Sequence, residues 1–179
     1  MNPIEFSLAT MADYPLLKRI NLDFDSNYVW QSQMNDDVNE YSITLKNVKL
    51  PKTIHVPFQA NDENNLEMTI KLNEIILIRT DRQEIGFIRI EQDELAHRII
   101  LRNGGLKPEY RRQGIGTIML GQIEEIARQN NITQILCIIQ AKNDSAIRFL
   151  TAKGFRLSGF EEFYFPNMEI ALFFSKNIH

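Results

Sequence analysis

The sequence predicts an α/β fold built on a mixed, mostly antiparallel sheet that is flanked by helices. Three strand-like segments follow one another over 74–80, 83–91 and 95–106 with only short polar turns between them, which is typical of an antiparallel meander. A helical segment then leads to another apolar strand over 132–140. A strand–helix–strand unit of this length requires a parallel pair with a right-handed crossover.

The segments before this sheet predict one strand and one helix. Residues 4–9 alternate between apolar and polar side chains, which favours a strand. Residues 10–21 predict a helix, for which Thr10 is a suitable cap. Pro15 is tolerated only if the regular helix begins close to it, because a proline further inside would remove a hydrogen bond.

Region 22–73 is expected to hold a strand pair. Residues 28–33 and 41–50 alternate well enough to form its two strands. Connecting and turn residues in this region are Pro51, Pro57 and the polar run 61–65.

The C-terminal part predicts two helices and a closing hairpin. Residues 114–130 form an amphipathic pattern with isoleucines at three- and four-residue spacing. The shorter second helix is capped by Asn143 or Asp144 and is ended by a glycine. The second helix spans 145–153, and the hairpin strands span 155–164 and 168–175 around Pro166-Asn167.

The length and composition indicate a single globular domain. The chain has 179 residues, of which 44% are hydrophobic and 24% charged, so we expect a single domain over 1–179 with 22–73 as a packed extension. A net charge of −3 argues against nucleic acid as the main partner. The start of the chain has no apolar signal segment and no run is long enough to span a membrane, which favours a cytoplasmic protein without a membrane partner. The single cysteine, Cys137, lies in an apolar run and predicts a buried, reduced thiol.

A basic, glycine-bearing turn precedes the long helix. Its residues Arg111 to Gly116 have the form R-x-x-G-x-G. The first N–H groups of a helix lack intrahelical partners, and the helix dipole favours an anion there. Gly114 and Gly116 let backbone approach a phosphate, and Arg111 and Arg112 add positive charge. The alternative is a basic helix start whose glycines serve only for turning.

Two other phosphate motifs fit less well. The chain has no G-x-x-x-x-G-K-[ST] segment, which excludes a typical P-loop. A dinucleotide fingerprint needs a third glycine and an acidic residue about 20 residues later, and the strand over 133–140 carries no acid.

Two spaced motifs resemble the GNAT superfamily of N-acetyltransferases, which move an acetyl group from acetyl-CoA to an amine. The first is V-x-P-x-x-R-G-x-G-[IV]-G, matched here with Leu106 for Val and Arg112 for Gly. The second is N-x-x-A-x-x-[FL]-Y-x-x-x-G-F, matched over Asn143 to Phe155 with Leu150 for Tyr. The resemblance covers about 85–175 and implies a GNAT-like sheet with a splayed parallel strand pair that receives the pantetheine arm.

The same resemblance implies a cosubstrate site. Backbone N–H groups of the turn would bind the pyrophosphate, the Leu106 amide would face the thioester carbonyl, and Asn143 would hydrogen-bond the pantetheine arm. For Asn143 the alternative is a pure helix cap. The predicted cofactor-binding residues are Leu106, Arg111, Arg112, Gln113, Gly114, Ile115, Gly116, Thr117 and Asn143.

The departure at Leu150 leaves the catalytic acid open. In many family members the tyrosine at this point protonates the leaving thiolate, which leucine cannot do because it has no donor. Tyr164 is a candidate replacement, with a packed strand aromatic as the alternative. A thiolate could also leave to water, since a free thiol has a pKa near 8.5.

The general base is equally open. Glu91 is the candidate that we carry forward, and the alternative for any one such residue is a solvated charge. The others, by sequence position only, are Glu94, His97, Glu161 and Glu162. No His/Cys cluster with metal-ligand spacing occurs, so no metal is expected.

The C-terminal half is most similar to the streptothricin acetyltransferase branch of the family. Residues 140–143, 154–160 and 169–174 carry that similarity, with a weaker one over Asp23 to Trp30. Acidic and aromatic residues near a binding mouth suit a cationic amine. We therefore expect an acetyl-CoA-dependent N-acetyltransferase of a small-molecule amine. Alternatives are a protein or peptide N-acetyltransferase and a non-catalytic acyl-CoA-binding module; a homodimer stays open.

Overall fold

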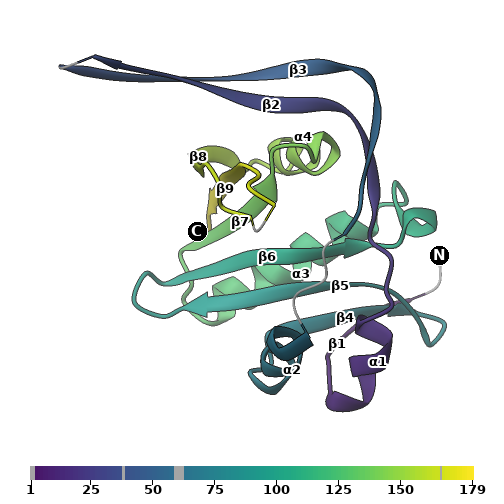
Figure 1. Ribbon diagram of the computed structural model, residues 1–179. Coiled ribbons are helices and arrows are strands. Elements are labelled where there is room, and N and C mark those ends of the chain that lie inside the picture. Colours follow the sequence, from purple (N-terminus) through teal and green to yellow (C-terminus); the bar gives the residue numbers. More distant parts are fainter. Residues whose placement is uncertain (1–2, 38, 59–62, 166) are drawn as a thin grey trace.

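The structure, a computed structural model, describes residues 3–37, 39–58, 63–165 and 167–179 (Figure 1). The strands are β1 (Ile4–Leu8), β2 (Phe24–Asp37), β3 (Glu40–Val56), β4 (Ile75–Thr80), β5 (Gln83–Asp93), β6 (Arg98–Leu106), β7 (Gln134–Gln140), β8 (Arg156–Glu161) and β9 (Ala171–Asn177). The helices are α1 (Tyr14–Leu17), α2 (Glu63–Lys71), α3 (Ile115–Gln129) and α4 (Asp144–Ala152), and two 3-10 turns are η1 (Met11–Asp13) and η2 (Pro108–Tyr110).

Within the described ranges, seven strands form one sheet in the order β1-β4-β5-β6-β7-β9-β8, and β2 and β3 form a separate ribbon. The β6–β7 pair is parallel, and its neighbours along the sheet pair antiparallel. The meander and the crossover through α3 are therefore confirmed. So is the predicted α/β class, a mixed and mostly antiparallel sheet.

Helices cover both faces of the sheet, and strand alternation divides the core accordingly. On β4, Ile75 and Leu77 pack with α1 and α2, whereas Ile78 packs with α3 and α4. Figure 1 shows α3 behind the central strands and α1 and α2 at the opposite face. In the ranges that the structure describes, no helix is long and apolar enough to cross a membrane.

β6 and β7 pair over only part of their length. Their register runs from Arg98↔Gln134 to Leu101↔Cys137 and then stops, although β6 continues to Leu106. The two strands diverge beyond this last pair, and we call the space between them the slot. The splayed pair that the sequence resemblance implied is present.

A glycine bulge accompanies the divergence. The β5–β6 register shifts between Ile88 and Ile90, so that two residues of β6 stand opposite one residue of β5. Gly104 follows directly with φ = +141°. A Cβ atom there would lie 2.3 Å from the Phe87 carbonyl oxygen, so this position requires glycine.

The β2–β3 ribbon is longer than predicted. Its ladder runs from Phe24↔Val56 to Asp37↔Glu40, well beyond the predicted strands 28–33 and 41–50. Pro51, expected to mark a connection, lies inside β3. It is tolerated because residues 50–53 stand opposite Asn27 alone at a register shift, where no ladder N–H is needed.

Two helix predictions in the N-terminal half were wrong. The helix predicted over 10–21 is only η1 followed by the single turn α1. Pro15 stands at its start, and an Arg19 N–H···Leu16 O bond of 2.9 Å closes it. Residues 63–65, predicted as part of a polar turn, begin α2, while 61–62 lie outside the described residues. Only Leu66 and Ile70 give α2 an apolar stripe, which is too short to stand out in the sequence.

Replacing Gly104 tests the bulge. We predict that Gly104→Ala lowers the free energy of unfolding by about 2 kcal/mol or more, because the new Cβ meets backbone. Urea denaturation followed by circular dichroism measures the change. Gly105→Ala is the matched control, since a Cβ there meets nothing within 4 Å. Equal stability of the two variants would contradict the bulge geometry.

Candidate functional site

The turn before α3 has a backbone conformation suited to an anion. Arg112 and Gly114 both adopt positive φ, at +61° and +83°, and the intervening Gln113 does not. Such alternation turns successive N–H groups toward one concave side. Gly114 is also the N-cap of α3, so the concavity lies at the positive end of the helix dipole.

Five backbone donors of this turn are unpaired. The N–H groups of residues 112–116 have no hydrogen-bond acceptor among the described residues, whereas Thr117 donates to the Gly114 carbonyl at 2.9 Å. Polar backbone groups left without a protein partner bind solvent or a ligand. The predicted loop residues Arg112, Gln113, Gly114, Ile115 and Gly116 are therefore brought together as donors.

Arg111 supports the turn from below. Its Nε donates to the Leu106 carbonyl at 2.8 Å and its Nη2 donates to the Leu22 carbonyl at 3.0 Å. Partial burial lowers the pKa of this guanidinium. Nε and Nη2 thus bind backbone carbonyl groups of the protein, and Nη1 can donate to a bound molecule.

Leu106 faces the slot with its backbone. The next residue, Lys107, donates its N–H to the Ile85 carbonyl of β5 at 2.8 Å. Because successive residues of a strand direct their N–H groups to opposite sides, the Leu106 N–H points toward β7. This is the orientation that a donor to a molecule in the slot needs.

Asn143, at the end of β7, is a helix cap. Its Oδ1 accepts the Ala146 N–H at 3.1 Å, so the carbonyl oxygen of this side chain serves as the helix cap of α4. Its Nδ2 has no acceptor among the residues that the structure describes, and it can donate to a bound molecule.

The two catalytic candidates lie together on the face of the sheet away from α3. Arg102 donates from Nε and Nη2 to the Glu91 carboxylate and from Nη1 to the Tyr164 hydroxyl oxygen, the latter at 2.5 Å. The hydrogen bond from Arg102 lowers the pKa of Glu91, which makes it a weaker base. The Tyr164 ring packs edge-on against Phe165 and Phe173, with centroids 5.1 and 5.8 Å away.

The other candidates for the general base lie further from the slot or already accept a hydrogen bond. Glu94 and His97 belong to the β5–β6 turn, at the end of β6 opposite the divergence. Glu161 is exposed at the end of β8, and the carboxylate of Glu162 accepts the Ser32 hydroxyl at 2.7 Å.

Leu150 and Cys137 are core residues. Leu150 is 4% exposed and packs among the buried side chains under α3 and α4. Burial raises the pKa of the Cys137 thiol strongly, so this thiol is inert, as predicted.

The β2–β3 ribbon crosses the open end of the slot. Just before the ribbon, the Leu22 carbonyl accepts from Arg111. Further along, the main-chain N–H of Trp30 donates to the Ala141 carbonyl at 3.0 Å. Asn47 Nδ2 donates to Asp144 at 2.6 Å. Figure 1 shows the ribbon passing over α4 and continuing outward beyond β8. The ribbon thus links the ends of both slot walls.

An ionic contact joins the two strands of the ribbon near its base. His55 Nδ1 and Nε2 lie 2.9 Å from Asp25 Oδ1 and 3.2 Å from Asp23 Oδ2. The hydrogen bond with Asp25, assisted by the one with Asp23, raises the pKa of His55 above its ordinary value of 6.5.

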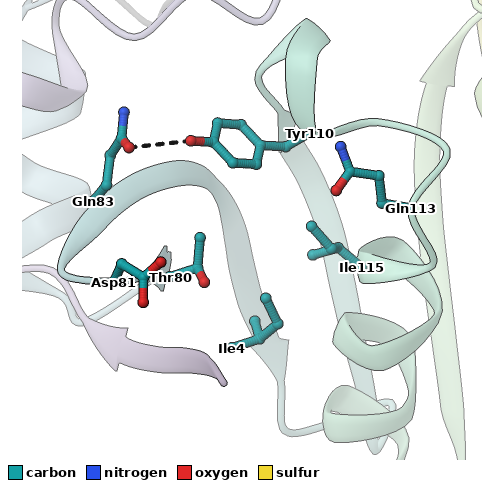
Figure 2. A pocket seen from close by; sticks show the side chains of 7 residues that line it. All are labelled: Ile4, Thr80, Asp81, Gln83, Tyr110, Gln113 and Ile115. Atoms are coloured by element: carbon teal, nitrogen blue, oxygen red, sulfur yellow. Dashed lines mark hydrogen bonds between the residues drawn. The ribbon is translucent and has the colours of Figure 1, made fainter. Parts of the chain in front are cut away.

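A pocket of about 330 Å³ adjoins the turn on its other side (Figure 2). Tyr110 donates to Gln83 Oε1 at 3.1 Å across one wall. Its lining residues are Ile4, Thr80, Asp81, Gln83, Tyr110, Gln113 and Ile115. None belongs to β6 or β7, so the pocket is separate from the slot but shares Gln113 and Ile115 with the turn.

The comparison with protein families decides the identity. The model of the acetyltransferase (GNAT) family matches residues 35–155, more than half of the chain. The chain belongs to this family. It is an acetyltransferase that uses acetyl-CoA.

A fly relative and a plant structure are similar to the GNAT chain in sequence and in fold, respectively. It is 29% identical over 139 residues to the Drosophila melanogaster protein "Probable N-acetyltransferase san", covering 75% of this chain and 74% of that one. It is also similar in fold to Arabidopsis thaliana Naa50 in complex with the bisubstrate analogue CoA-Ac-MVNAL, with 20% identity, a TM-score of 0.65 and 97% of each chain covered.

Two further structures belong to the branch that the sequence indicated. Nourseothricin acetyltransferase superposes with a TM-score of 0.81 and 18% identity over 98% of this chain and 99% of that one. A Bacillus anthracis protein assigned as a streptothricin acetyltransferase, in complex with acetyl coenzyme A, gives a TM-score of 0.72 and 18% identity over 99% and 98%. At these identities the likeness shows a shared fold.

Sequence reasoning missed Arg102 and underused Trp30. Arg102 lies within a strand and belongs to no recognisable motif. Its contacts with Glu91 and Tyr164 depend on the strand pairing, which the sequence alone does not fix. Trp30 was noted only within an aromatic segment, since its backbone contact with Ala141 spans more than a hundred residues.

The ribbon contact predicts a measurable histidine titration. We expect a His55 pKa above 6.5 by NMR, and a lower one in Asp25→Asn. Because the folded-state pKa is raised, the stabilisation is complete below the unfolded pKa and is lost as pH rises through the raised value. His179, exposed at the C-terminus, is the internal control. An unchanged His55 pKa in Asp25→Asn would contradict the contact.

Proposed function

We propose that this GNAT chain transfers the acetyl group of acetyl-CoA directly to the amine of a small molecule. The observation that carries the proposal is the position of the ribbon beside both walls of the slot. Leu22, just before β2, accepts from Arg111, which also holds the Leu106 carbonyl at the end of β6. The main-chain N–H of Trp30 in β2 donates to the carbonyl of Ala141, just after β7. A strap across the open end leaves less room for an extended polypeptide than for a compact acceptor. Similarity to nourseothricin acetyltransferase over almost the full length of both chains supports the same reading.

Backbone donors would hold the cosubstrate. The N–H groups of residues 112–116 at the start of α3 suit a diphosphate, since they are unpaired within the described chain and carry the helix dipole. Leu106 N–H and Asn143 Nδ2 then suit the carbonyl groups of a pantetheine arm in the slot. Bound acetyl-CoA supplies the thioester whose acetyl group is transferred. Positioning of this kind can provide much of the rate.

Tyr164 would take the role that Leu150 cannot. Arg102 donates to the Tyr164 oxygen, so the hydroxyl hydrogen is free to point elsewhere. A phenol fixed in this way can donate a proton to a leaving thiolate. Glu91 holds Arg102 in place through its carboxylate, which is a positioning role in addition to the predicted one as a base.

A second candidate function is acetylation of protein or peptide N-termini. The similarity to Naa50, whose bisubstrate analogue carries a peptide, favours this alternative. For this reaction an extended peptide must be able to reach the slot past the ribbon.

An acceptor panel separates the two candidates. Release of free CoA thiol from acetyl-CoA, measured with a thiol reagent, should appear with polyamines or streptothricin-type amines and stay at background with N-terminal peptides. Turnover on peptides alone would overturn the small-molecule proposal. CoA binding without turnover on any acceptor would contradict both candidates.

Tyr164→Phe tests the proposed proton donor. We predict a fall in kcat of roughly 100-fold with little change in the KM for acetyl-CoA, because only the hydroxyl is lost. Tyr14→Phe, in α1, is the matched control and should keep full activity. A Tyr164→Phe enzyme with unchanged kcat and an unchanged pH profile would remove Tyr164 from the mechanism.

A further inference from the structure

The outer part of the ribbon projects from the body of the molecule. The cross-strand pair Ser32 and Leu45 still touches the body, since the Ser32 hydroxyl donates to Glu162 at 2.7 Å and Leu45 packs against the core. We call the part beyond this pair, residues 33–37 and 39–44, the arm. Every side chain of the arm that the structure describes is exposed, and Figure 1 shows the arm extending past β8. A two-stranded ribbon is only marginally stable alone, so the arm is expected to pack against another surface.

One face of the arm carries an apolar pair. Side chains of directly opposite residues share a face, and so do those of every second residue along a strand. Met34 and Ile43 are directly opposite and lie on the face through which Trp30 and Leu45 pack against the core. They are nevertheless 52% and 49% exposed. The apolar face of the ribbon thus continues outward beyond the body that covers its inner part.

Charge distinguishes the two edges of the arm. β2 carries three aspartates and no lysine or arginine, so two copies of its edge would repel each other. β3 carries one acidic residue, Glu40, near the turn, and its first lysine, Lys46, follows six residues later; both are exposed. A strand with separated opposite charges is complementary to a second copy of itself that runs antiparallel.

Antiparallel pairing centred on Ile43 satisfies both faces of β3 at once. On one face Glu40 stands opposite the partner's Lys46, and the two-fold axis repeats this ion pair. On the other face Ile43 meets the partner's Ile43, so that Met34, Ile43 and their copies form one apolar row across four strands. A register shift of one residue would lose both ion pairs and put Ile43 opposite a polar residue. The paired stretch 40–46 ends before Pro51, whose missing N–H would interrupt a longer ladder.

We propose that the β3 edge of the arm pairs with the same edge of a second copy of this chain, which gives a two-fold dimer with a four-stranded sheet. The outer edges of that sheet are then the β2 strands, whose aspartates oppose further association. Since the same two strands cross the slot nearer the body, the dimer also holds the ribbon there. The inference does not rest on the proposed function, because no step of acetyl transfer enters it.

Sedimentation equilibrium of the full chain tests the charge pairs. The wild type should be a dimer. Glu40→Lys and Lys46→Glu should each weaken the dimer roughly 10- to 30-fold, since each replaces two attractions by two repulsions, and the double variant should restore it. Lys52→Glu is the matched control, because it makes the same charge change beyond Pro51 and should leave the dimer unchanged.

Cysteine cross-linking tests the register. Ile43→Cys should form an intermolecular disulfide under mild oxidation, because directly opposite residues have Cα atoms about 4.5–5.5 Å apart. Met34→Cys is the matched control: it lies on the same face and is as exposed, but about 14 Å, or three strand spacings, separates it from the partner's Met34. The native Cys137 is buried and stays unreacted. Non-reducing electrophoresis reads the result.

Two outcomes would overturn the proposal. A folded wild type that sediments as a monomer at every accessible concentration would do so, and would leave the β3 edge to another occupant such as an extended peptide. A dimer that the double variant does not restore, or that cross-links through Met34→Cys and not through Ile43→Cys, would place the interface elsewhere. Thermal unfolding confirms that each variant folds, as expected for changes at exposed positions.

Discussion

The divergence of β6 from β7 beyond Leu101 and Cys137 is the constraint on which the rest of the structure depends. Where two parallel strands separate inside a sheet, backbone donors and acceptors on their facing edges lose their ladder partners, and buried polar groups must find others. This chain supplies some of them itself. Arg111 binds the Leu106 carbonyl, and Trp30 binds the Ala141 carbonyl. Among the residues that the structure describes, a row of backbone donors at the start of α3 stays unpaired, and we propose that it binds a diphosphate.

The bulge and the ribbon both lie beside that divergence. Gly104 lets β6 bulge against β5, because any Cβ atom at this position would clash with the Phe87 carbonyl oxygen. The ribbon spans the widened end and is tied there by Asn47 to Asp144 as well as by Trp30. A two-stranded ribbon is only marginally stable alone, so these ties also hold β2 and β3 against the body.

How far the sequence predicted this arrangement depends on whether the determinants are local. The turn at 111–116, the amphipathic α3 and the Asn143 cap are each encoded within a few residues, and each was predicted. Arg102 beside Tyr164, and Pro51 inside β3, depend on strand register, which alternating patterns specify only when one face is clearly buried. The helix α2 was missed because two buried side chains give too weak a period. The GNAT resemblance supplied the slot, which neither composition nor spacing implies.

The chemistry divides along the slot. In the proposed function the turn and Asn143 hold the cosubstrate, and Tyr164 with Arg102 lies where the two strands part. Under this proposal the acceptor preference can change without altering the donors that hold acetyl-CoA. This is consistent with GNAT proteins of related fold that differ in their acceptors.

The central claim is that main-chain amides at the start of α3 hold the diphosphate of acetyl-CoA. Titration of the ¹⁵N-labelled protein with CoA, followed by amide chemical shifts, tests it most directly. The account predicts large, saturable shifts for residues 112–117, and similar shifts with a diphosphate fragment that lacks the pantetheine arm. Saturable CoA binding that leaves these amides unmoved and shifts only distant residues would contradict it.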